Sequence, residues 1–173
     1  MTTDTGYLGT KLEADLGRDV IRTRFYSLTP FMGAGARIWD RGIESAAFAD
    51  AETGEIRLAR GYTESWRNFY LRAGISGTRR FAGHLRGFFS AGAKIPIHTE
   101  NAVDSNLLEP EGRLSGFAEA GIERGRISIS AFYESMRFSE SDWEYFYDGT
   151  DYGYIYQPES KADIFGIHAG FSF

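Results

Sequence analysis

The sequence predicts an all-β protein, an antiparallel up-and-down transmembrane β-barrel of about eight strands. Several stretches alternate apolar and polar residues with a period of two, and the connections between them are alternately short and long. No stretch has a helical period, and none approaches the apolar run that a membrane helix needs. The mean hydropathy of -0.34 fits such a barrel, because alternation hides its apolar half. The 173 residues predict a single domain.

The last stretch, Lys161 to Phe173, carries the clearest signal for a membrane. From Phe165 onward one face is wholly apolar, and the other mixes small and polar groups. The stretch ends on Phe173, and it resembles the C-terminal strand of bacterial outer-membrane β-barrels. This resemblance implies a bacterial outer-membrane location. Because Met1 to Asp4 have neither a charged n-region nor an apolar h-region, the chain is expected to be a mature form without a signal peptide.

The alternation predicts seven strands and leaves the existence of an eighth undecided. The seven are residues 7–16, a strand that ends at 39, and residues 66–75, 81–97, 113–123, 126–138 and 161–173. Pro30 is poorly tolerated within a strand ladder. Either one long strand begins near Arg24, or a short strand at Val20 to Ser27 precedes a new one at Phe31. Bacterial barrels have even strand numbers, so either the short strand is real or an N-terminal strand is lacking.

The connections predict which end of the barrel faces outward. Residues 76–80 and 124–125 are short, whereas residues 40–64, 99–112 and 139–160 are long. This is typical of tight periplasmic turns and long outer loops. The alternative is a soluble lipocalin-like barrel that binds a ligand in an apolar interior. Ala91 and Ala93 lie between large residues on the apolar face, which favours contact with lipid because a packed core would be left with voids.

Three motifs resemble a family of uncharacterised proteobacterial outer-membrane barrels of the small, eight-stranded type. They are Leu28 to Arg37, with the pattern PF.G.G.R, Thr63 to Leu71, and Gln157 to Ser160. The resemblance covers roughly residues 13–173. It implies an outer-membrane fold in contact with the lipid bilayer and lipopolysaccharide, and it implies no known activity.

Charged residues of both signs recur on the polar face of the strands. A barrel of eight strands leaves room for little besides side chains, and buried charges need partners. The sequence therefore predicts ion pairs that fill the lumen and leave no open pore. The predicted network is Arg37, Arg72, Arg86, Lys94, Glu119 and Glu123. The same face is expected to carry Lys11, Glu13, Asp15, His84, Glu134 and His168, together with His98 at its loop end.

Several function classes receive no support. The net charge of -5 argues against nucleic acid, and the absence of cysteine excludes thiolate chemistry. No histidine pair has metal-ligand spacing, so neither a metal nor a cofactor is expected. A lipid A deacylase-like enzyme is the catalytic alternative. It needs a serine near its histidine, but Glu100 stands two residues after His98 and the placement of Ser105 is not fixed. The chain is therefore expected not to be an enzyme.

The long segment 141–156 has the most unusual composition, with seven aromatic residues among four acids. Tyrosine and tryptophan give rigid contact area, and aspartate and glycine allow turns. The acids do not have EF-hand spacing for Ca²⁺. The segment is either a plain connector or a recognition surface, and the latter predicts a structural or surface-binding role with an unknown surface partner. The predicted binding residues are Trp143, Tyr145, Phe146, Tyr147, Asp148, Asp151 and Tyr152.

Overall fold

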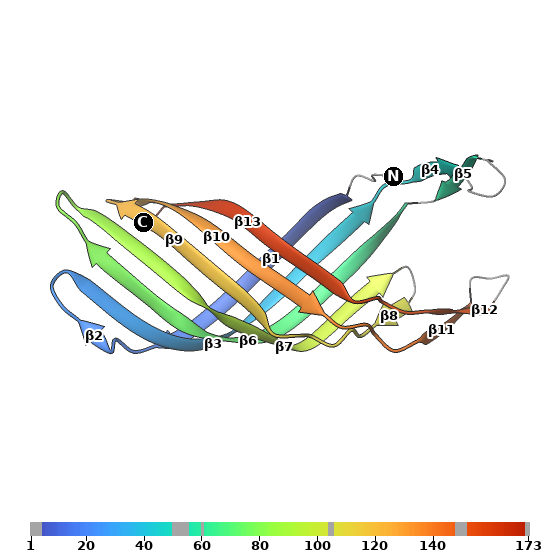
Figure 1. Ribbon diagram of the computed structural model, residues 1–173, viewed down its shortest axis with the longest axis horizontal. Coiled ribbons are helices and arrows are strands. Elements are labelled where there is room, and N and C mark those ends of the chain that lie inside the picture. The colour runs from blue at the N-terminus through green and yellow to red at the C-terminus, as the bar shows by residue number, and fades with distance from the viewer. Residues whose placement is uncertain (1–4, 50–55, 60, 104–105, 148–151, 172–173) are drawn as a thin grey trace.

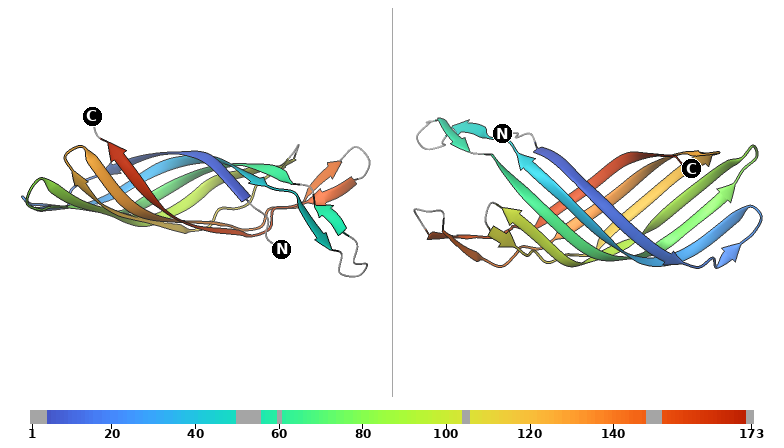
Figure 2. Two further views of the ribbon diagram at one scale, coloured as in Figure 1. Left: turned by 90° about the horizontal axis from the view of Figure 1, so that it is seen from above. Right: turned by 180° about the vertical axis from the view of Figure 1, so that it is seen from behind.

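The computed structural model describes residues 5–49, 56–59, 61–103, 106–147 and 152–171. It is an all-β, antiparallel protein whose main sheet is strongly curled into a half-barrel (Figures 1 and 2). The all-β antiparallel prediction is thus confirmed. Within the described ranges, no helix is long and apolar enough to cross a membrane. The long strands are β1 (Thr5–Gly17), β3 (Tyr26–Ile43), β6 (Tyr62–Arg80), β7 (Leu85–Val103), β9 (Ser115–Arg124), β10 (Ile127–Phe138) and β13 (Ser160–Phe171).

The long strands follow one another in space in the order of the chain, β1-β3-β6-β7-β9-β10-β13, and each pairs antiparallel with the next. The sheet stays open between its first and last strands. Among the described strands β1 pairs only with β3, and β13 pairs only with β10. Six antiparallel steps leave β1 and β13 running in the same direction, so they cannot complete the antiparallel ladder by pairing with each other.

The short strands lie in the connections. They are β2 (Ile21–Arg22), β4 (Ala46–Ala49), β5 (Ile56–Ala59), β8 (Asn106–Leu108), β11 (Glu144–Tyr147) and β12 (Tyr152–Ile155). The hairpins β4–β5 and β11–β12 and the strand β8 all lie at one end of the sheet (Figure 1). The turns after β1, β6 and β9 lie at the other end. We call these the loop end and the turn end.

The region before Trp39 is one long strand, and a separate barrel strand at Val20 to Ser27 is not found. Only β2 forms there, as two residues that pair with Ser27 and Leu28 at the start of β3. Pro30 lies inside β3, and its carbonyl accepts a hydrogen bond from the Arg18 amide at 3.4 Å. Its nitrogen faces the same side, where β1 has already ended at Gly17, so β3 loses no inner ladder bond.

Two histidines expected on the polar face lie elsewhere. The turn between β6 and β7 comprises residues 81–84, later than the sequence indicates, and His84 lies in it with a φ of 61°. A bulge in β7 displaces His98. Phe69 pairs with His98 but Tyr70 pairs with Pro96, so Ile97 is an extra residue and every later side chain changes face. His98 therefore stacks on the outward ring of Phe69, with 6.2 Å between ring centroids.

The inner face is tightly packed where rings lie on glycines. A Cβ atom added at Gly35 of β3 would come within 2.5 Å of the Tyr70 ring, whereas one added at Gly42 of the same strand would meet nothing within 4 Å. Tyr70 donates a hydrogen bond to Glu13 at 2.6 Å. Because Gly35 has no side chain, the Tyr70 ring can lie against β3, and this places the Tyr70 hydroxyl beside Glu13.

We expect Gly35→Ala to lower the free energy of unfolding by about 1 to 3 kcal/mol, because the Tyr70 ring must move and loses its bond to Glu13. Gly42→Ala is the matched control, and it should change stability by no more than about 1 kcal/mol. Thermal unfolding in detergent, followed by circular dichroism, measures both. Equal effects of the two substitutions would contradict this packing.

Candidate functional site

The centre of the inner face holds two carboxylates, one buried and one half-buried, that are joined by one lysine. Glu13 comes from β1 at one edge of the sheet, Glu134 from β10 near the other edge, and Lys94 from β7 between them. The Lys94 Nζ lies 2.9 Å from Glu13 Oε1 and 2.6 Å from Glu134 Oε1. Lys94 and Glu134 are each 4% exposed. Burial of this depth requires that the charges neutralise one another.

Three further cations complete this group, which we call the ion cluster. Arg37 lies 2.8 Å from Glu134 Oε2, and Lys11 lies 3.4 Å from the same oxygen and 3.5 Å from Glu13 Oε2. Arg72 pairs with Glu13 and, at 3.4 Å, with Asp15. The cluster consists of Lys11, Glu13, Asp15, Arg37, Arg72, Lys94 and Glu134.

Aromatic rings pack around the cluster and leave almost no free volume. The Arg72 guanidinium lies 4.3 Å from the centre of the Phe117 ring, and Lys94 Nζ lies 4.7 Å from that of Tyr70. The cavity between Arg37, Lys94 and Glu134 measures only 10 Å³. That is about the minimum that one water molecule needs, so this level of the interior has no room for a substrate.

The six residues predicted as the lumen network divide into two groups. Arg37, Arg72 and Lys94 belong to the ion cluster. The other three lie nearer the turn end in separate pairs. Arg86 pairs with Glu123 at 2.5 Å, and Glu119 accepts a bond from Ser130 at 2.5 Å and lies 3.3 Å from His168. The alternation places Glu13 and Glu134 on this face but gives no reason to choose them as the centre.

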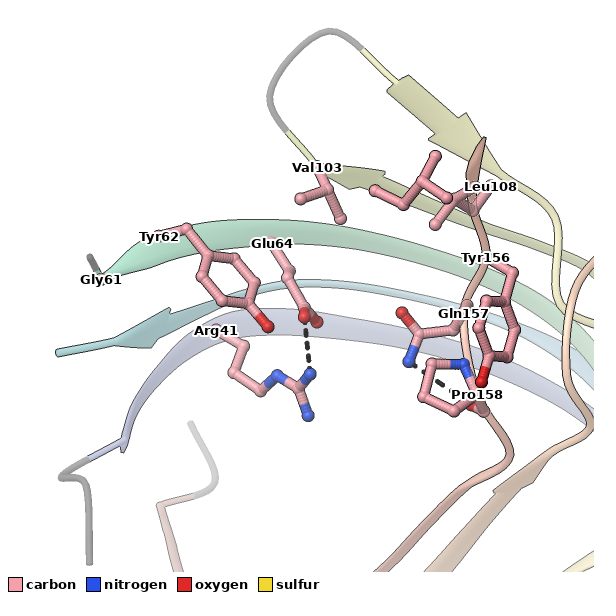
Figure 3. Close-up of a pocket in the computed structure, with 10 residues that line it drawn as sticks. Arg41, Gly61, Tyr62, Glu64, Val103, Leu108, Tyr156, Gln157 and Pro158 are labelled. Carbon is pink, nitrogen blue, oxygen red and sulfur yellow. Dashed lines mark hydrogen bonds and ion pairs between the residues drawn. The ribbon is translucent and has the colours of Figure 1, made fainter. Parts of the chain in front are cut away.

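A cavity of 720 Å³, drawn in Figure 3, is lined by residues at the loop end of the sheet. We call it the mouth. The buried Glu64 accepts bonds from Arg41 at 2.6 Å and from the Trp66 indole at 2.8 Å. Tyr62 and Tyr156 line the mouth from separate segments. Burial, and then the charge of Glu64, raises the pKa of Tyr62 above its ordinary value. Sequence reasoning missed this site, because its residues belong to distant segments.

Gln157 fastens the long connection between β10 and β13 to the sheet. Its side-chain oxygen accepts a hydrogen bond of 2.6 Å from Asn101, which is fully buried on β7. Its backbone amide donates to Ser141 Oγ at 2.8 Å, and the Ser141 amide donates to the Gln157 carbonyl at 2.9 Å. The neighbouring Glu159 accepts a bond from Lys161 Nζ at 2.7 Å. This bond, and then the charge of Arg113, lower the pKa of Glu159 below its ordinary value.

The aromatic–acidic segment forms the hairpin β11–β12, which stands beyond the end of the curled sheet (Figures 1 and 2). Tyr145 lies opposite Tyr154 and stacks on Tyr152 with 5.4 Å between centroids. These three rings are 58%, 67% and 68% exposed, and Trp143, at 63%, packs on Tyr156. We call this group the aromatic patch. Of the other predicted binding residues, Phe146 and Tyr147 are in β11, whereas Asp148 and Asp151 lie outside the described residues.

The outer face carries a histidine–carboxylate pair but no complete catalytic set within the described residues. His98 Nε2 lies 2.9 Å from Glu100 Oε1. The hydroxyl of the neighbouring Thr99 is buried in the interior. Ser105 lies outside the described residues. In the described ranges, no group of three or more His, Asp or Glu side chains could hold a metal ion.

Comparison with known proteins does not assign the chain to a family: no family model matches it, and no curated protein matches it. Any indication of function therefore comes from the geometry of the ion cluster, the mouth and the aromatic patch.

We expect charge reversal to separate the two groups of predicted lumen charges. Arg72→Glu should cost about 3 to 5 kcal/mol of folding free energy, because it leaves Glu13 buried beside a second negative charge. Arg86→Glu is the matched control, since the Arg86 side chain is 44% exposed, and it should cost about 1 kcal/mol or less. Urea unfolding of the refolded protein measures both costs. Similar costs would show that the cluster is no more buried than the turn-end pairs.

Proposed function

We propose that this protein is an integral outer-membrane β-barrel, plugged by charge pairs, whose loop end has a surface-binding or structural role. The observation that carries the membrane part is a continuous apolar belt on the outer face. On β6 the belt runs from Phe69 to Ile75, with Ser65 and Arg67 above it and Arg79 below. Its members on neighbouring strands include Leu12, Ile95, Ile129, Phe165 and Ile167, all more than half exposed.

The distribution of polarity supports lipid over water as the surrounding solvent. Leu16 and Ile167 are 82% and 78% exposed, whereas Glu134 and Lys94 are 4% exposed. A soluble ligand-binding barrel needs the reverse arrangement, with apolar side chains inside. An exposed apolar surface that covers the outer face of the sheet is costly in water and favourable in hydrocarbon.

The binding part rests on the loop end, because the interior is filled. The aromatic patch lies on the β11–β12 hairpin, which projects beyond the end of the main sheet (Figure 1), and its rings at Trp143, Tyr145, Tyr152 and Tyr154 are more than half exposed. Rigid, exposed aromatic rings beside acidic residues are typical of a recognition surface for a protein or glycan partner. The Asn101–Gln157 bond fixes the base of this segment to β7, which holds the hairpin in place.

We expect Leu71→Arg, in the middle of the belt, to lower the folded fraction in lipid vesicles, at a cost of about 2 to 4 kcal/mol. Ser65→Arg is the matched control on the same strand and face, but above the belt, and it should be nearly neutral. Heat-modifiable migration on gels reports the folded fraction. A monodisperse, detergent-free monomer that tolerates Leu71→Arg would favour the soluble barrel instead.

We expect the double substitution Tyr145→Ser and Tyr154→Ser to reduce adhesion of proteoliposomes carrying the chain to whole Gram-negative cells by roughly thirtyfold, at about 1 kcal/mol per lost ring. Phe25→Ser with Tyr26→Ser removes two exposed rings at the turn end and serves as the control. Adhesion is counted from a fluorescent lipid. Unchanged adhesion, or an equal loss in the control, would leave a structural role as the better proposal.

A further inference from the structure

Arginine residues gather at the turn end of the sheet, where acidic residues are few. The strand ends and turns there comprise residues 17–26, 78–87 and 122–128 (Figure 1). These segments hold eight of the 19 lysine and arginine residues of the chain but only two of its 24 acids, Asp19 and Glu123. The turn end is therefore strongly positive, although the chain as a whole has a net charge of -5.

Three of these arginines lie on the outer face, directly below the apolar belt. Arg79 is below the belt on β6, and Arg124 follows the outward Ile122 by two residues on β9. Arg18 follows the outward Leu16 by two residues, and its amide still bonds to β3. All three arginines are exposed. We call Arg18, Arg79 and Arg124 the arginine rim.

The outer face carries paired charges at the loop end and unpaired charges at the rim. Above the belt, Arg67 lies 3.4 Å from Glu100, and Arg137 lies 2.6 Å from Asp163. No carboxylate among the described residues pairs with an arginine of the rim. The only two acids of the turn-end segments are already bonded to other arginines of those segments. The rim therefore offers its positive charge to a partner outside the chain.

Exposed aromatic rings lie among the turn-end arginines. The Arg79 guanidinium lies 5.2 Å from the centre of the Phe81 ring, and that of Arg24 lies 5.7 Å from the Phe25 ring. A Cβ atom at Gly87, which pairs with Arg79, would come within 3.1 Å of the Phe81 ring, so this ring covers the outer face beside Arg79. Rings and arginines at the edge of an apolar belt are typical of side chains at the level of lipid headgroups.

We propose that the arginine rim binds the phosphate groups of anionic phospholipids in the leaflet that surrounds the turn end. This inference rests on the proposed membrane location, because the belt places the guanidinium groups where the acyl chains end. A guanidinium donates two parallel hydrogen bonds to a phosphate. The long loops of the proposed barrel face outward, so the turn end meets phospholipid rather than lipopolysaccharide.

The test measures which lipid the rim prefers. The refolded protein in detergent receives phosphatidylglycerol and phosphatidylcholine in equal amounts with identical acyl chains, and native mass spectrometry counts the lipids that stay bound. We expect about a fivefold excess of phosphatidylglycerol, which corresponds to about 1 kcal/mol for an arginine at the membrane surface. The triple variant Arg18→Gln, Arg79→Gln and Arg124→Gln should reduce this excess to less than about twofold.

The matched control removes the same charge from the loop end. Arg67→Gln, Arg113→Gln and Lys161→Gln alter side chains that are 62%, 57% and 64% exposed, and this variant should keep the full excess. An equal loss in both triple variants would show that the preference follows net charge, which would overturn the rim as a site. If a triple variant does not fold, Arg79→Gln against Arg67→Gln gives the same comparison on one face of β6.

Heat-modifiable migration in vesicles of each lipid separates this inference from the membrane proposal. A protein that folds in neither lipid would overturn both proposals. A folded protein that binds the two lipids equally would overturn the rim alone. Binding of the detergent-solubilised protein to isolated peptidoglycan, lost in the rim variant and without any lipid preference, would show that the partner is the cell wall instead.

Discussion

The half-barrel depends on the buried bridge Glu13–Lys94–Glu134, because the curvature of an open sheet is not fixed by backbone pairing. Lys94 of β7 holds Glu13 at 2.9 Å and Glu134 at 2.6 Å, so three strands far apart in the sheet converge on one ammonium group. Arg37 and Lys11 add bonds from β3 and β1 to Glu134. Removing any one carboxylate would leave several cations buried together. The sheet must therefore curl by the amount that keeps all these charges paired.

The rest of the interior depends on the space this bridge needs. A charged cluster at the centre of a narrow sheet requires positions without side chains, and Gly35 supplies one beneath the Tyr70 ring, which bonds Glu13. Gly166 supplies another beneath Phe132, whose ring stacks on His168 with 4.2 Å between centroids. Glycines therefore stand beside polar and charged residues on this face, because they leave the space that the interior rings and paired side chains occupy.

The sequence alone predicts the faces well and the contacts poorly. A period of two assigns Glu13, Arg72 and Lys94 to one face because that depends only on local backbone geometry. It fails at His98, where the extra residue Ile97 reverses the faces, since nothing local distinguishes a bulge from a regular strand. Which charges pair depends on register across several strands. The mouth is harder still, because Arg41, Glu64 and Gln157 meet only after the long connections fold back.

The paired charges lie in the middle of the sheet, and the exposed rings lie at its loop end. The residues that stabilise the fold are thus separate from those proposed to bind a partner. The interior charges are paired and enclosed, so sequence changes there are costly. The loop end has its own contacts, chiefly Glu64 with Arg41 and Trp66, and Asn101 with Gln157. A hairpin fixed at its base by the Asn101–Gln157 bond can change its exposed rings without disturbing the cluster below. The proposed surface-binding role therefore suits β11 and β12, where a substitution alters the surface and leaves the charge pairing that maintains the curl.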